Sequence, residues 1–123
     1  MTTFQLEVLT PAPAARAPIL AILEAALAAV DPYQATRAFL AREGDLLTAG
    51  PQRYDLRRLR RVLVVGAGKA GAPMAQAVEA VLGERIDAGL VVVKTGHGGP
   101  TQRIEIVEAA HPRPDMAGVE AGR

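Results

Sequence analysis

The chain has 123 residues, a formal net charge of +1 and no cysteine. This length fits one domain with a single core. That core must be built from Ala, Val, Leu and Ile, because 50% of the residues are hydrophobic but only 3% are aromatic. The near-neutral charge argues against a nucleic-acid-binding surface, and the lack of cysteine excludes a disulfide framework or a thiolate metal site.

The sequence also lacks membrane and secretion signals. No apolar run approaches the ~20 residues that a membrane-spanning helix needs. The first residues, Met1–Glu7, have neither a basic region nor a continuous apolar region, which argues against a secretory signal. We therefore expect a cytoplasmic protein that binds neither nucleic acid nor membranes, and we predict no metal-ligating residues.

The amino-terminal part of the chain predicts an arm and a first helix. Residues 1–17 are rich in proline and alanine, which predicts a flexible arm with a short strand at Phe4–Leu9. Apolar residues then recur at helical spacing, which predicts a helix over 19–30.

A second helix and a connector are expected next. Asp31 is a good N-cap and Pro32 a good first-turn residue, so a helix is predicted over 32–42. Residues 45–61, which include Gly50-Pro51, predict a connector. Its arginine cluster is interpreted as a solvent-facing approach to the next strand.

From residue 62 onward, predicted strands and helices alternate, which favours an α/β fold. The apolar runs and the capping signals predict strands over 62–65, 90–94 and 104–108, a helix over 72–82 and a last helix over 116–123. This order predicts a Rossmann-like sheet of three mostly parallel strands, preceded by an amino-terminal helical pair.

A glycine-rich turn follows the first of these strands. Gly66, Gly68 and Gly71 fit the G-x-G-x-x-G pattern, in which backbone N–H groups and a helix N-terminus face an anion. Lys69 adds a mobile positive charge there. The dinucleotide fingerprint also requires an acidic residue after the second strand, but Lys94 occupies that position, and a lysine could tolerate a 2′-phosphate. The alternative interpretation is a glycine turn that only packs the helix against the strand.

Two further loops carry polar side chains. His97 lies between glycines after the second strand, while His111, Arg113 and Asp115 follow the third. Because the carboxyl ends of parallel strands meet at one edge of a sheet, these loops are expected to converge with Lys69. A phosphate or carboxylate ligand is the natural inference, with Asp115 also well placed to cap the next helix.

Three motifs in order resemble the amino-terminal part of the bacterial-type glycerate 2-kinases, a family long labelled hydroxypyruvate reductase. They are G-A-G-K-A at 66–70, G-H-G at 96–98 and H-P-R-P-D at 111–115. The helical stretch 19–40 is also similar, so the resemblance covers about residues 17–123. The combination is specific, although none of its parts is specific alone.

The resemblance implies phosphoryl transfer from ATP to the 2-hydroxyl of D-glycerate with Mg²⁺, and it implies that Lys69 is catalytic. It also implies these substrate- or phosphate-binding residues: Gly66, Gly68, Lys69, Gly71, His97, His111 and Asp115. Family members are much longer, with the active site in a cleft between two α/β domains. We therefore expect residues 18–123 to be part of a Rossmann-like domain, without the carboxy-terminal domain and inactive alone.

Other functions stay open on the sequence. An NAD(P)-dependent hydroxypyruvate reductase would use the glycine pattern and Lys94. A non-catalytic α/β module could bind an anion or pair with itself. An uncovered apolar face would also favour self-association, with a homodimer as one form.

Overall fold

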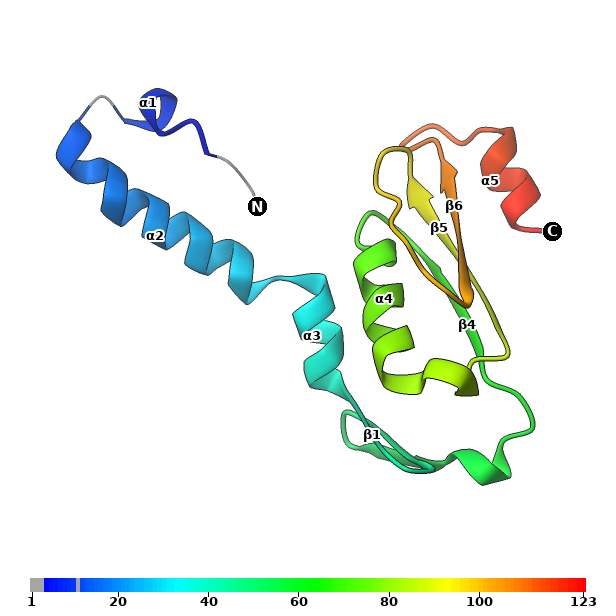
Figure 1. The fold of residues 1–123 in the computed structure, drawn as a ribbon. Helices are drawn as coiled ribbons and strands as arrows, with labels where there is room; N and C mark the ends of the chain where they lie inside the picture. Colours follow the sequence, from blue (N-terminus) through cyan, green and yellow to red (C-terminus); the bar gives the residue numbers. More distant parts are fainter. Residues whose placement is uncertain (1–3, 11) are drawn as a thin grey trace. The chain divides into compact units, whose positions relative to one another are not determined.

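The computed structural model describes residues 4–10 and 12–123, which divide into two compact units, Met1–Asp31 and Pro32–Arg123. The first unit contains helices α1 (Leu6–Leu9) and α2 (Pro13–Ala29) (Figure 1). Among the described residues, no single helix is long and apolar enough to cross a membrane, although two consecutive helices, Pro13–Ala29 and Pro32–Phe39, pass that test together.

The predictions for the first unit were partly wrong. Leu6–Leu9 is helical, not part of a strand, and α2 begins at Pro13, so part of the expected arm is helix. Residues 1–3 and 11 of that arm lie outside the described residues. Pro13 occupies the first turn, where its missing N–H costs nothing. The helix continues through Pro18 into a run rich in alanine and leucine, residues that favour helix.

The second unit begins with helix α3 (Pro32–Phe39) and a three-stranded antiparallel sheet, β1 (Leu40–Glu43), β2 (Leu46–Ala49) and β3 (Gln52–Asp55). The predicted helix over 32–42 is therefore confirmed at its start but ends at Phe39, and the expected connector at 45–61 contains β2 and β3.

Two glycine turns explain the antiparallel sheet. Gly44 and Gly50 have φ values of 59° and 55°, and each is the first residue of a two-residue loop between paired strands. A positive φ at the first loop position alone is the type II′ pattern, which suits the twist of a hairpin. Pro51 supports this geometry at the second position of its turn. The Gly-Asp and Gly-Pro pairs were the missed signals.

A parallel sheet forms the rest of the second unit, as predicted. Its strands are β4 (Leu63–Ala67), β5 (Ala88–Lys94) and β6 (Ile104–Ala109), in that spatial order. Val65 pairs with Leu90, and Val92 pairs with Val107. Helix α4 (Gly71–Leu82) joins β4 to β5, whereas a helix-free loop joins β5 to β6. A short helix, α5 (Met116–Ala121), follows β6.

The core lies between α4 and one face of the parallel sheet (Figure 1). Ala72 and Ala75 of α4 are buried against Val91 and Val93 of β5. The helix approaches closely because Gly71 has no side chain: a Cβ atom there would lie 2.6 Å from Val91 Cγ1. This contact fixes where α4 begins, and with it the glycine turn before the helix.

The other sheet face is only partly covered. Helix α5 packs mainly against β6, on the side opposite α4 (Figure 1). On β4, Leu63 is 57% exposed and Val65 is 84% exposed. Both faces of a parallel sheet are normally covered, so these two side chains form an uncovered apolar strip.

The loop between β5 and β6 is held by Glu79 of α4. Its carboxylate accepts backbone N–H groups from Gln102, Arg103 and Ile104 at distances of 2.6–3.0 Å. Desolvation raises the pKa of Glu79, but these backbone hydrogen bonds and the charge of Arg103 together hold the pKa below its usual range. The ionised carboxylate therefore stabilises the start of β6.

We expect Glu79→Gln to lower the free energy of unfolding by about 1–3 kcal/mol at pH 7, because three backbone N–H groups, that of buried Ile104 among them, lose an ionised acceptor. The folded pKa lies below the usual value of 4.5. The stabilisation should therefore be full above that value and disappear as the pH falls through the folded pKa. Denaturant unfolding at pH 7 and at pH 3 measures this. Glu84→Gln, an exposed neighbour, is the control, and equal stability of the two variants at pH 7 would contradict the role.

We expect Gly71→Ala to destabilise the fold by about 1–3 kcal/mol through overpacking. Its Cβ would meet Val91 and Val93 in the core. Thermal unfolding checks this result, with Gly122→Ala as control because its Cβ would make ordinary contacts at 3.6 Å or more. A stable Gly71→Ala protein would show that this glycine does not serve helix packing.

Candidate functional site

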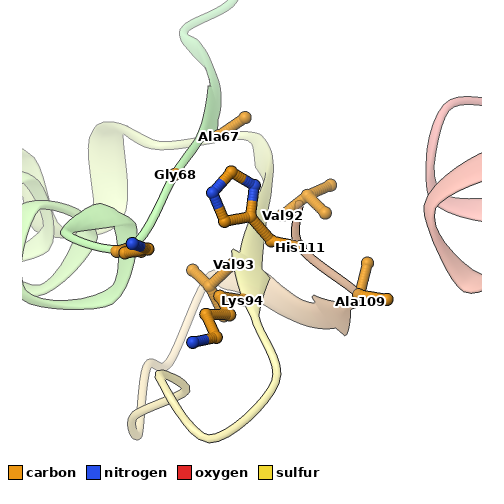
Figure 2. Close-up of a pocket in the computed structure, with 9 residues that line it drawn as sticks. Ala67, Gly68, Val92, Val93, Lys94, Ala109 and His111 are labelled. Atoms are coloured by element: carbon orange, nitrogen blue, oxygen red, sulfur yellow. The ribbon is translucent and has the colours of Figure 1, made fainter. Parts of the chain in front are cut away.

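A pocket of about 340 Å³ lies at the carboxyl ends of the three parallel strands (Figure 2). All three strands contribute to its wall, and so do the segments that follow β4 and β6. The lining residues are Ala67, Gly68, Lys69, Val92, Val93, Lys94, Ala109, Ala110 and His111. The pocket therefore lies at the sheet edge where the sequence places the site.

The first wall is the turn between β4 and α4. Gly68 has a φ of 123°, a conformation open to glycine but strained for other residues, and its N–H donates to the carbonyl of Val92 at 2.9 Å. The N–H of Gly71 donates to the carbonyl of Gly68 at 3.0 Å, and Pro73 has no N–H. The sequence predicts that N–H groups of this turn face an anion, but those of Gly68 and Gly71 donate to carbonyl groups of the protein itself. Lys69, which is exposed, supplies the charge of this wall.

The other two walls bring Lys94 and His111 to the same pocket. Lys94 is the last residue of β5, and His111 follows β6. Figure 2 shows the His111 ring directed toward Ala67 and Gly68, while the Lys94 side chain runs the other way. Among the described residues that line this pocket, two are lysines, one is a histidine and none is acidic. The pocket therefore suits a carboxylate or a phosphate.

His97 lies outside this set of lining residues. It is exposed in the turn after β5, where its N–H donates to the carbonyl of Lys94 at 2.8 Å. The flanking N–H groups of Gly96 and Gly98 each donate to the Glu108 carboxylate at 3.0 Å. These two hydrogen bonds, from Gly96 first, lower the pKa of Glu108, and the charge of His97 adds to the effect. The glycines around His97 thus serve a carboxylate of the chain itself.

Asp115 serves the backbone in a similar way. One oxygen accepts the N–H of Gly118 at 3.0 Å and caps α5, and the other accepts the N–H of Ala110 at 3.1 Å. Ala110 and His111 line the pocket, so Asp115 holds the backbone of that wall without lining the pocket itself. Arg113, in the same loop, is not among the lining residues.

The structure therefore divides the predicted site residues. Gly68, Lys69, Lys94 and His111 come together around the pocket. Other predicted residues do not line it: Gly66, Gly71, His97, Arg113 and Asp115. The bonds from Gly96 and Gly98 to Glu108, beside the pocket, were not predicted. The signal that could have revealed these bonds is a Gly-x-Gly turn after one strand together with a glutamate near the end of the neighbouring strand.

Metal binding needs a group of suitable ligands. Within the described ranges 4–10 and 12–123, no three His, Cys, Asp or Glu side chains lie close enough together to hold an ion. The lysines and the histidine that line the pocket suit a phosphate group of a ligand.

Known proteins resemble this chain over short parts of their own length. A glycerate 2-kinase from Pyrococcus horikoshii is 32% identical over 96 residues, which are 78% of this chain and 21% of that protein. A protein from Agrobacterium vitis with a hydroxypyruvate reductase name is 51% identical over 61 residues, or 50% of this chain and 14% of that protein.

A solved structure is similar to this chain in both fold and sequence. The glycerate kinase from Thermotoga maritima matches with a TM-score of 0.60 and 34% identity, over 83% of this chain and 22% of that one. The chain thus spans less than a quarter of the length of each of these three proteins. Residues 18–123 match the family described as Domain of unknown function (DUF4147), and the chain belongs to that family.

Proposed function

We propose that this chain is the amino-terminal portion of a D-glycerate 2-kinase that uses ATP. The observation that carries the proposal is a cationic pocket at the strand ends of a segment similar to glycerate 2-kinases. In the reaction, the 2-hydroxyl oxygen of D-glycerate forms a bond to the γ-phosphorus, and the bond from that phosphorus to the bridging oxygen of ADP breaks. The hydroxyl proton leaves to a base or to water.

The residues of this chain would act mainly through position and charge. Phosphoryl transfer needs little covalent chemistry from the protein, so preorganised cations provide most of its catalysis. Lys69 lies at the turn before α4 and would neutralise charge on the transferring group. Lys94 and His111, on the other walls, would hold an anionic group of D-glycerate or ATP.

The rest of the proposal concerns the whole enzyme. Mg²⁺ would accompany ATP and take its protein ligands from outside this segment. A carboxy-terminal domain would close the pocket, so the 123-residue chain alone would be inactive. A cytoplasmic location suits an enzyme that consumes ATP.

A reductase is the second candidate, because one relative carries a hydroxypyruvate reductase name. Nicotinamide dinucleotide folds usually place an acidic residue after the second strand, where it binds the ribose. Here the last residue of β5 is Lys94, which suits a 2′-phosphate at best. Release of ADP from ATP and D-glycerate supports the kinase, whereas oxidation of NADPH by hydroxypyruvate supports the reductase. Absence of both activities in the full-length protein would favour a binding module.

We expect Lys69→Ala in the full-length protein to reduce kcat for glycerate phosphorylation by about 10²–10³, with a smaller change in KM. The reason is that the lysine matches charge on the transferring group most closely in the transition state. Steady-state kinetics measure both constants. Arg60→Ala, which removes an exposed cation outside the pocket, is the control. Unchanged kcat in a folded Lys69→Ala enzyme would remove this residue from the mechanism.

We also expect the isolated chain to self-associate, with a homodimer as the simplest form. Leu63 and Val65 leave an apolar strip that water solvates poorly. Sedimentation velocity over a range of concentrations tests this, and Val65→Lys should shift the chain toward monomer. A monomer at every concentration in the unmodified chain would contradict the expectation.

A further inference from the structure

The turn after β5 is tied to a carboxylate from the neighbouring strand. Oxygen Oε2 of Glu108 accepts the N–H of Gly96, and Oε1 accepts the N–H of Gly98, both at 3.0 Å. Glu108 precedes the last residue of β6. One side chain thus fixes two peptide groups of a turn that belongs to another strand.

The glycines of this turn fit the carboxylate closely. A Cβ atom at Gly98 would lie 2.6 Å from Glu108 Oε1, so any side chain there would displace the acceptor. Gly96 has a φ of 79°, which glycine adopts without strain. The Glu108 carboxylate therefore leaves room only for a glycine at position 98. The backbone conformation of Gly96 allows its N–H to reach the same carboxylate.

The same turn is bonded to two walls of the candidate pocket. The N–H of His97 donates to the carbonyl of Lys94 at 2.8 Å, and the N–H of Thr95 donates to the carbonyl of Ala109 at 3.0 Å. Lys94 and Ala109 both line the pocket. Movement of this turn would therefore pass directly to the backbone that carries the Lys94 ammonium group.

We propose that Glu108 is a positioning residue for the anion-binding pocket: it holds the 95–98 turn so that Lys94 meets a carboxylate or phosphate oxygen of the ligand. The nature of that ligand rests on the proposed glycerate kinase function. Glu108 itself does not line the pocket. Its removal leaves the backbone bonds of Thr95 and His97 in place, so the turn should loosen while the sheet stays folded.

The first test observes the turn without any enzyme activity. In the ¹⁵N-labelled 123-residue chain, Glu108→Gln should move the amide signals of Gly96 and Gly98 upfield and speed their hydrogen exchange by at least about tenfold. A glutamine has one acceptor oxygen and so cannot keep both bonds. Glu105→Gln, which removes an exposed carboxylate from the same strand, is the matched control and should change neither signal.

The second test titrates the unmodified chain and its Glu108→Gln and Glu105→Gln variants with D-glycerate and, separately, with inorganic phosphate. The Lys94 amide signal reports binding. Weaker binding of D-glycerate alone identifies a carboxylate site, and weaker binding of phosphate identifies a phosphate site. In the full-length protein, Glu108→Gln should raise the KM of the affected substrate roughly tenfold and leave kcat within about twofold. This split is expected because a positioned binding group contributes equally to the ground state and the transition state.

The outcomes separate the two proposals. Unchanged Gly96 and Gly98 signals in Glu108→Gln would overturn the positioning role, as would changed signals with unchanged affinity and KM. If Glu108→Gln does not fold, Glu108→Asp replaces it, because a shorter carboxylate keeps the charge but cannot reach both amides. A full-length protein that phosphorylates no glycerate refutes the proposed function, while the phosphate titration still tests Glu108.

Discussion

The close approach of α4 to the parallel sheet is the contact on which the rest of the second unit depends. It is possible because Gly71 places only hydrogen where any larger residue would strike Val91. The contact buries the alanine face of the helix and fixes its first turn. Lys69 stands two residues before that turn, so packing in the core determines where its charge enters the pocket. The third glycine of the fingerprint is therefore explained by packing, whatever ligand the turn binds.

The second constraint comes from the short path between β5 and β6. Parallel strands usually need a long crossover, most often a helix that satisfies its own backbone. Residues 95–103 form no helix, and four of their N–H groups find acceptors in side chains instead: those of Gly96, Gly98, Gln102 and Arg103. Glu108 holds the first part of this loop, and Glu79 holds the last part. Two glutamates thus replace the hydrogen bonds that a crossover helix would have supplied, and each is ionised to do so.

The parallel sheet could be predicted from the sequence because its signals are local. Val62–Val65 is apolar without interruption, and the glycine and capping residues mark where α4 begins and ends. The antiparallel sheet was missed because its strands are only four residues long and two of them contain charged residues, so their pattern is weak beside the turn signals at Gly44 and Gly50. Helix α2 was underestimated because prolines suggested an arm, although Pro13 lies at a position where proline starts a helix.

The candidate site was predictable at the level of the sheet edge, but not residue by residue. Strand order alone placed Lys69, Lys94 and His111 together. The capping of α5 by Asp115 was also predicted and is confirmed, but the bonds from Glu108 to Gly96 and Gly98 were not, because they depend on how the loop folds back. These carboxylates bind peptide N–H groups outside the pocket, and none of the described residues that line the pocket is acidic. Positive charge on the wall of a pocket is best satisfied by an anionic ligand, so the preference of this pocket follows from the lysines that line it.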